Sequence, residues 1–421
     1  MEHKVNKAAV RFNEFSDLPK VFNLVDLSVT GISNGVFNDT KKVGSGYRLI
    51  NVKDMYDTNY VDTKKLTLLN IEDKEFNKNK VQYGDIFFTR SSIVPSGIAY
   101  SNVCLSKAED ITFDGHLMKL SPDLSFVEPS YLAYKLRTWT MRTRLIRRGK
   151  QSTMTTIGQS DIADIPVELP TIEEQQKIAS FLSKVDEKIA LLTEKKDKLT
   201  EYKKGVMQQL FNGKWEEQEG LLTFIPPTLR FKADDGSEFP DWEKKKGAKL
   251  FASISNKDHN SDLPVLAITQ NQGAIPRSLI DYNISVADTS VASYKVVEKG
   301  DFIISLRSFQ GGIEYSEYTG ICSPAYVILR PKIDISDYFY KYYLKTYPFI
   351  VEMQKRLEGI RDGKIISYKY FSEISMPYPT KVEQDKIVCF LSALEQKISL
   401  ATSELEKAKE WKRGLLQQMF V

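Results

Sequence analysis

The segment PTIEEQQKIASFLSKVDEKIALLTEKKDKLTEYKKGVMQQLF, which begins at Pro170, occurs a second time as PTKVEQDKIVCFLSALEQKISLATSELEKAKEWKRGLLQQMF from Pro379. The offset is 379 − 170 = 209 residues, and it holds without a gap as far as Phe211 and Phe420. About half of the aligned positions are identical. An internal repeat of this length predicts one structural unit that the chain uses twice.

Each copy carries apolar residues in a heptad pattern, which is typical of a coiled-coil helix. At ~1.5 Å per residue, a helix of about 38 residues is about 57 Å long. Lys196 and Lys203 interrupt the pattern in the first copy, which leaves the packing there open. Two matching seams in one chain can bury each other, so we expect the helices to pair antiparallel. The expected seam residues are Ile178, Leu182, Val185, Ile189, Leu192, Leu199, Val206, Ile387, Leu391, Leu394, Ile398, Leu405 and Leu415.

The regions before the two copies are less alike, but they share landmarks in the same order. Gly84-Asp85 precedes an apolar run, as Gly300-Asp301 does. Strand-like runs are followed by a helix, from Pro129 to about Arg148 in the first region and after Ser336, a good N-cap, in the second. We therefore expect an α+β fold, with two mixed α/β domains separated by two long antiparallel coiled-coil helices with internal pseudo-two-fold symmetry. The expected boundaries are 1–169 and 216–378 for the two domains, and 170–215 and 379–421 for the two helical spacers.

An antiparallel pair would place the two domains at opposite ends of the helices. Dimeric DNA readers address two half-sites about one turn of duplex apart with such symmetry. Because the two domains differ here, the predicted target is two different half-sites separated by a fixed, unread spacer. Helix length would then set the length of the spacer.

Charge is unevenly distributed, although the net charge is only +4. From Tyr131 to Lys150 the chain has seven cations and no acidic residue, and the following residues are rich in Gln, Ser and Thr. Clustered cations bind phosphates, and these polar side chains read base edges. Each single cation can equally be a solvated surface charge, and the loops after the strand-like runs can be mere turns. The candidate DNA-binding residues are Arg90, Ser91, Ser92, Arg144, Arg147, Arg148, Lys150, Gln151 and Ser152 in the first domain, and Arg307, Ser308, Gln310, Arg361, Lys364 and Lys369 in the second.

Motifs for catalysis are missing from the sequence. No GxGxxG or GxxxxGK(S/T) loop is present, and Ser323-Pro324-Ala325-Tyr326 lacks the second proline of an amino-methyltransferase motif. The three histidines are too dispersed for a zinc or hydrolytic site. The sparse cysteines, the absence of a signal-like start and the lack of a long apolar run predict a cytoplasmic protein without catalytic or metal residues and without a membrane partner.

The doubled P-x-x-E-Q-x-K-I-x-x-F-L at 170–182 and 379–391 resembles the helical repeats of type I restriction–modification specificity subunits. GDIFFTR at 84–90 and DIADIPVELP at 161–170 are also similar to this family. The resemblance covers essentially the whole chain, and it implies a bacterial, non-catalytic DNA-binding subunit with two target-recognition domains. It implies as partners double-stranded DNA, two modification subunits that use S-adenosylmethionine to methylate adenine, and two motor–nuclease restriction subunits that use ATP and Mg. No cofactor is expected in this chain.

Two alternatives stay open at this point. The chain could serve a methylation-only system, which neighbouring genes would distinguish, or it could be an adaptor that joins two protein-binding domains. An adaptor would bind DNA with little dependence on salt, whereas a DNA reader loses affinity steeply as salt rises. The recognised sequence and the spacer length do not follow from these residues, because base readout depends on loop geometry.

Overall fold

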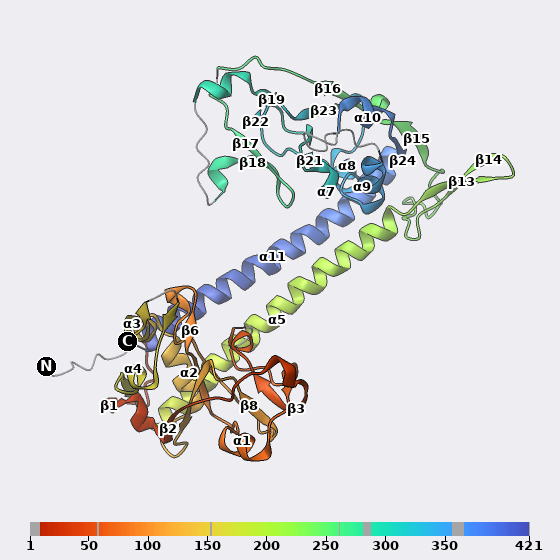
Figure 1. Cartoon of the computed structure of the whole chain (residues 1–421). Helices are drawn as coiled ribbons and strands as arrows, with labels where there is room; N and C mark the ends of the chain where they lie inside the picture. The colour runs from red at the N-terminus through yellow and green to blue at the C-terminus, as the bar shows by residue number, and fades with distance from the viewer. Residues whose placement is uncertain are drawn as a thin grey trace. The chain divides into compact units, whose positions relative to one another are not determined.

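The computed structural model describes residues 9–56, 59–151, 154–260, 262–280, 288–355 and 366–420 (Figure 1). The chain forms two compact units. Unit 1 consists of Met1–Glu194 and Thr402–Val421, and unit 2 consists of Lys195–Ala401. Each unit therefore combines one mixed α/β domain with a part of both repeat segments.

The two repeat segments are long helices, as the heptad pattern predicts. Helix α5 extends over Ile172–Leu210 and helix α11 over Lys381–Met419, with 39 residues in each. Every predicted seam residue is at least partly removed from solvent. Ile178, Leu182, Val185, Val206, Ile387, Leu391, Leu394 and Leu405 are buried, and Ile189, Leu192, Leu199, Ile398 and Leu415 are half-buried.

Within each unit the two helix segments run antiparallel. In unit 1, Leu182 of α5 belongs to the same buried cluster as Met419 near the end of α11. Four residues further along α5, Asp186 pairs with Lys412, which lies earlier on α11. In unit 2, Leu210 near the end of α5 shares a cluster with Ile387 near the start of α11.

Lys203, which interrupts the seam, makes an ion pair inside unit 2. Its Nζ lies 2.5 Å from Oε1 of Glu395 on α11 and 5.3 Å from the centre of the Tyr342 ring. The Tyr342 hydroxyl donates a hydrogen bond of 2.9 Å to the other oxygen of Glu395. A charged residue in a coiled-coil seam can specify register when it has a fixed partner.

Unit 1 contains the same arrangement. Lys412 Nζ lies 2.5 Å from Oδ1 of Asp186 and 5.5 Å from the Tyr134 ring, whose hydroxyl donates to Oδ2 of Asp186 at 2.7 Å. The offsets 412 − 203 and 395 − 186 are both 209. We call each Lys, acid and Tyr set a register triad, because it fixes which residues of α5 and α11 face each other within its unit.

The Glu of each repeat motif anchors the chain that enters its domain. Arg11 donates from Nε and Nη2 to the two oxygens of Glu174, both at 2.6 Å. Arg230 makes the same two-point contact with Glu383, at 2.8 and 3.1 Å. Both carboxylates are buried, and such bidentate pairs are geometrically specific.

The Gln of each motif ties the long helix to the start of the helix that follows the central sheet, which is α2 in unit 1 and α8 in unit 2. Gln175 accepts from the backbone N of Glu128 at 3.0 Å, and Gln384 accepts from the backbone N of Ser336 at 2.9 Å. Both glutamines are buried. The Glu-Gln pair that both copies of the repeat share therefore serves contacts within each unit.

Unit 1 is built around a four-stranded antiparallel sheet with the order β2-β9-β5-β7. A second sheet, β4-β3-β8, contains one parallel pair, and β1 pairs with β12 next to α5. The elements are β1 Lys20–Asn23, β2 Ser28–Asn34, β3 Val43–Ile50, β4 Thr67–Leu69, α1 Asp73–Lys78, β5 Ile86–Thr89, β6 Ser91–Ser92, β7 Ser101–Val103, β8 Ile111–Phe113, β9 Leu117–Pro122, α2 Pro129–Arg137, α3 Trp139–Arg147, β10 Lys150–Gln151, β11 Thr155–Thr156, α4 Gln159–Ala163 and β12 Pro166–Leu169.

Unit 2 repeats the central sheet in the order β16-β23-β20-β21, and β15 pairs with β24 as β1 pairs with β12. The elements are β13 Lys214–Gln218, β14 Leu221–Ile225, β15 Glu243–Lys246, α6 Gly247–Leu250, β16 Phe251–Ile254, β17 Leu266–Thr269, β18 Gly273–Pro276, β19 Lys295–Val297, β20 Phe302–Ile304, α7 Ser308–Gly311, β21 Glu314–Tyr315, β22 Gly320–Cys322, β23 Val327–Pro331, α8 Asp337–Tyr343, α9 Tyr347–Gln354, α10 Tyr368–Glu373 and β24 Ser375–Tyr378.

The two Gly-Asp landmarks form the same turn before a central strand. Gly84 and Gly300 have φ of 91° and 99°, a conformation that favours glycine. The aspartates that follow, Asp85 and Asp301, are buried. Each accepts a hydrogen bond of 2.8 Å from the backbone N–H of the residue three positions earlier in the chain. Lys119 neutralises Asp85, and Arg330 neutralises Asp301. Burial raises the pKa of Asp85, and Lys119 opposes this effect.

The single helix predicted from Pro129 to about Arg148 is wrong in one respect, because it is broken into α2 and α3 at Thr138. The Thr138 side chain accepts from the backbone N of Met141 and donates to the carbonyl of Lys135, so it caps the second helix and ends the first. Thr346 separates α8 from α9 in unit 2, 208 residues later, and its hydroxyl donates to the carbonyl of Tyr343. In the second domain, helix α8 begins after Ser336, as predicted, although the Ser336 side chain makes no capping hydrogen bond.

Candidate nucleic-acid interface

Two groups of candidate residues that are distant in sequence come together in unit 1. Strand β11 pairs with β6, which contains Ser91 and Ser92, and on its other edge with β10, which contains Lys150 and Gln151. Arg90 is exposed at the start of this ribbon, where its backbone N donates to the carbonyl of His116. The three-stranded ribbon therefore brings the two candidate segments next to each other, while Ser152 lies outside the described residues.

The loop after β6 presents exposed apolar side chains that the charge pattern of the sequence does not predict. Ile93 is 85% exposed, Val94 is 56% exposed, and Met154 next to β11 is also exposed. Exposed apolar residues beside cations are unusual on a surface that has no partner. Only the apolar pair directly after Arg90-Ser-Ser could have indicated this feature.

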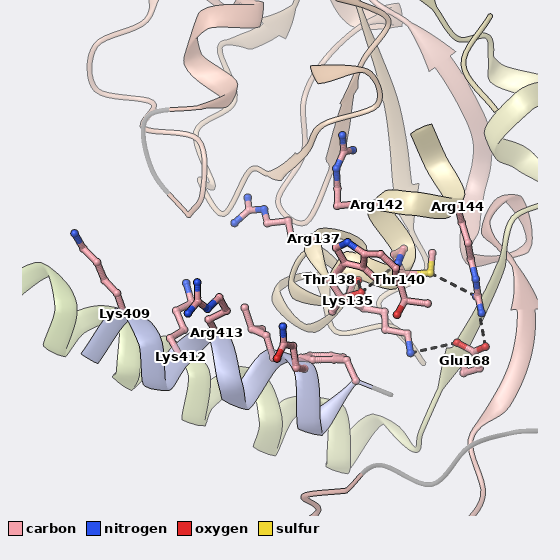
Figure 2. A pocket seen from close by; sticks show the side chains of 15 residues that line it. Lys135, Arg137, Thr138, Thr140, Arg142, Arg144, Glu168, Lys409, Lys412 and Arg413 are labelled. Carbon is pink, nitrogen blue, oxygen red and sulfur yellow. Dashed lines mark hydrogen bonds and ion pairs between the residues drawn. The ribbon is translucent and has the colours of Figure 1, made fainter. Parts of the chain in front are cut away.

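Several cations of the 131–150 stretch make contacts within unit 1. Lys135 lies 3.2 Å from Glu168, and Arg144 lies 3.5 Å from the same carboxylate and donates to the carbonyl of Pro166 (Figure 2). Burial lowers the pKa of Lys135, and Glu168 opposes this effect. Arg137 and Arg142 donate to backbone carbonyls, including those of Ser101 and Ala99. The charge of this stretch is thus partly used to join α2 and α3 to the rest of the unit.

The cations at the end of α3 are more accessible. Arg147 is exposed, Arg148 lies 3.2 Å from the exposed Asp164, and Lys150 lies 3.0 Å from Asp161 with most of its own side chain in solvent. The backbone N–H of Gly158 and the Lys150 ammonium lower the pKa of Asp161. Surface ion pairs of this kind are weak and exchange readily with other anions.

Unit 2 has a different structure at the corresponding strand end. A short helical turn, α7, follows β20, and it exposes Arg307 and Gln310 while Ser308 is buried against the backbone N of Ser305. Lys369 is exposed on α10. Arg361 and Lys364 lie outside the described residues. The two units therefore present unlike surfaces, a ribbon in one and a helical turn in the other.

The described residues contain no group of three or more His, Cys, Asp or Glu side chains that could hold a metal ion. In the same part of the chain, none of the helices combines the length and the apolar character needed to cross a bilayer. Cys104 and Cys322 are buried, and burial raises the pKa of Cys322 to about 12.

These features define a protein with two unlike mixed domains, each fixed to the same duplicated helical element by the same contacts. The family described as type I restriction modification DNA specificity domain matches residues 20–201 and 242–410, which is most of the chain. A Methanocaldococcus jannaschii protein named for the specificity subunit of the type I restriction enzyme MjaX is 24% identical over 422 residues, covering 96% of this chain and 93% of that one. The MjaVIII specificity subunit of the same organism is 24% identical over 71% of each chain.

Among solved structures, the S subunit of a type I restriction–modification system from M. genitalium aligns with a TM-score of 0.56 at 16% identity, covering 99% of both chains. This similarity shows a shared fold. The chain therefore belongs, by its family match, to the type I restriction–modification specificity subunits.

Proposed function

We propose that this chain reads a bipartite, asymmetric DNA target, with one half-site for each domain and a fixed unread spacer between them. The observation that carries the proposal is that both units share the same contacts with the long helices, whereas the surfaces at the ends of their central strands differ. The arginine–glutamate anchors, the glutamine ties and the register triads occur in both units, whereas the strand ends have a ribbon in one unit and a helical turn in the other. Two domains that recognise different DNA sequences on one scaffold need shared contacts with the helices and different recognition surfaces.

In the first domain, the ribbon β6-β11-β10 and the end of α3 would approach the duplex. Arg90, Arg147, Arg148 and Lys150 would contact phosphates, and Ser91 and Ser92 would lie close enough to read base edges, a role that we also propose for Gln151 from its residue type. In the second domain, Arg307, Gln310 and Lys369 would serve the corresponding contacts. Ser308 is buried, so its role would be to shape the turn.

The helix pair would hold the two domains apart as a ruler. The antiparallel pairing seen within each unit supports this arrangement, because each triad joins one residue of α5 to one residue of α11 in the same relation. Pairing along the full length would give the chain an approximate internal two-fold axis. The domains 1–169 and 216–378 would then stand at the two ends of the helical spacers.

The chain would contribute recognition and assembly, while the chemistry would come from its partners. Modification subunits would supply S-adenosylmethionine-dependent adenine methylation, and restriction subunits would supply ATP- and Mg-dependent cleavage. The frame that is common to both units provides two equivalent places for a partner. We propose two copies of each subunit per chain and a cytoplasmic location.

Methylome sequencing of cells with and without the gene tests the proposed function. We expect one two-part adenine-methylated motif, with unlike halves and a constant gap, to disappear when the gene is deleted. An unchanged methylome together with salt-insensitive DNA binding would contradict the proposal and favour a two-headed protein adaptor.

A further inference from the structure

A groove lies in unit 1 between the start of α3 and the last turns of α11 (Figure 2). Its volume is about 790 Å³. Leu416 of α11 and Phe420, which directly follows this helix, contribute apolar surface, and Arg413 and Trp139 also line it. Trp139 is the first residue of α3 and is 76% exposed. We call this groove 1.

Unit 2 contains a groove of about 780 Å³ between the last turns of α5 and the start of α9. Met207 and Phe211 take the places of Leu416 and Phe420, Lys204 takes the place of Arg413, and Tyr347 takes the place of Trp139. Tyr347 is the first residue of α9 and is 75% exposed. We call this groove 2.

Most residues that line one groove have a counterpart in the lining of the other, although the surfaces at the ends of the central strands differ between the two domains. Groove residues on the long helices are related by the offset of 209, and those on α3 and α9 by 208. A surface that reads bases should differ between the domains, because the half-sites differ. A surface that repeats in both domains fits a partner that is present twice.

The chemistry of the grooves indicates what that partner presents. Large aromatic side chains with three quarters of their surface in solvent are typical of protein interfaces. Groove 1 is lined by seven cations and one carboxylate, and the described lining of groove 2 has three lysines and no carboxylate. Lys412 in groove 1 and Lys203 and Lys345 in groove 2 each pair with a carboxylate just outside the lining, so the cationic character rests mainly on the remaining cations, among them Arg413 and Lys204. In groove 1, Arg137 and Arg142 donate mainly to neutral oxygens, so their positive charge is not cancelled by their partners. An apolar floor inside a cationic rim fits an amphipathic segment with carboxylates better than a DNA backbone, whose interfaces are polar.

From this repetition we infer that grooves 1 and 2 each dock the same acidic, amphipathic segment, presented by two copies of one partner protein. The inference rests on the proposed function, in which the modification subunit is that partner. It adds the place of docking, with Trp139 and Tyr347 as equivalent anchors and Arg413 and Lys204 as equivalent charge contacts.

The test uses the full chain co-expressed with its modification subunit, and native mass spectrometry of the purified complex counts the partner copies. We expect two copies for the wild type. Trp139→Ala with Arg413→Glu should leave one copy, Tyr347→Ala with Lys204→Glu should leave one copy, and the quadruple variant should leave none. Thermal melting of each variant checks that the chain stays folded.

Phe37→Ala in unit 1 and Leu279→Ala in unit 2 are matched controls, because both residues are exposed and apolar but lie outside the grooves. Both controls should retain two copies. The inference is overturned if a folded groove variant also retains two copies, including the case in which it loses DNA affinity and so marks the groove as a nucleic-acid surface. A wild-type chain that recruits no modification subunit would overturn the proposed function as well.

Discussion

The charged residues in the seam show how a local defect in a sequence pattern can be a specific contact. Lys203 and Lys412 each lie on the face of their helix that packs against the other long helix. The heptad pattern alone does not assign a partner to either lysine. The acidic partners lie on the other helix, and the tyrosines that complete the triads lie in the domains. Contacts between segments so distant in sequence could not be predicted from either segment alone.

Neutralising the better buried triad tests its contribution to stability. The Asp186 and Lys412 side chains are 13% and 17% exposed. We expect Asp186→Asn to lower the free energy of unfolding by about 1–3 kcal/mol, because the largely buried Lys412 ammonium then has no charged partner. Urea unfolding followed by tryptophan fluorescence measures this, since Trp411 packs against Phe181 in the same unit.

The matched control is Glu406→Gln on α11. Glu406 is 63% exposed and pairs with a neighbour on its own helix. We expect its effect to stay within about 0.5 kcal/mol. Equal effects of the two substitutions would show that the triad is not a special contact.

Glu168 gives unit 1 a defined response to acid. Burial would raise the pKa of its carboxyl, but Lys135 and Arg144 outweigh burial, so the pKa lies below the usual 4.5. The unfolded chain therefore takes up this proton first, and stability is lost as the pH falls below about 4.5. We expect Glu168→Gln to be less stable at neutral pH and to show a flatter pH dependence in acid, measured by thermal melting across a pH series. A dependence as steep as that of the wild type would contradict this assignment.

At the scale of elements, the regular patterns were predictable and the irregular contacts were not. The heptads predict α5 and α11 within a few residues, and the Gly-Asp landmarks predict the strands β5 and β20. The break at Thr138 was missed, because a threonine inside a helical pattern becomes a cap only through its local hydrogen bonds. The ribbon was missed because β6 and β11 are more than sixty residues apart.

The ribbon and the end of α3 predict a measurable salt effect. We expect Arg147→Ala with Lys150→Ala to weaken binding of the assembled complex to all DNA sequences. The dependence of affinity on salt should also become shallower by about one unit of slope for each phosphate that the variant no longer neutralises. Fluorescence anisotropy over a salt series measures both effects.

Lys74→Ala on α1 is the control for that experiment, because Lys74 is an exposed cation of the same unit away from the ribbon. Its affinity and salt slope should equal those of the wild type. If the double variant also matches the wild type, the α3 end is not part of the DNA interface.

For the whole molecule, the two triads require the same number of residues between their positions on α5 and on α11. The separations 203 − 186 and 412 − 395 are both 17 residues. A heptad inserted into α5 alone between its triad residues should break one triad and impair assembly. Matched heptads in both helices should preserve both triads and lengthen the pair by about 10 Å, which corresponds to about three base pairs. Methylome sequencing should then show the same half-sites with a longer gap, and an unchanged gap would mean that the helices do not measure the spacer.

The most direct test of recognition by two separate domains is exchange of residues 1–169 for the corresponding domain of another family member, followed by methylome sequencing. We predict a new motif in which one half-site has changed, while the other half-site and the gap are unchanged. A motif in which both halves change, or in which neither does, would contradict the assignment of one half-site to each domain.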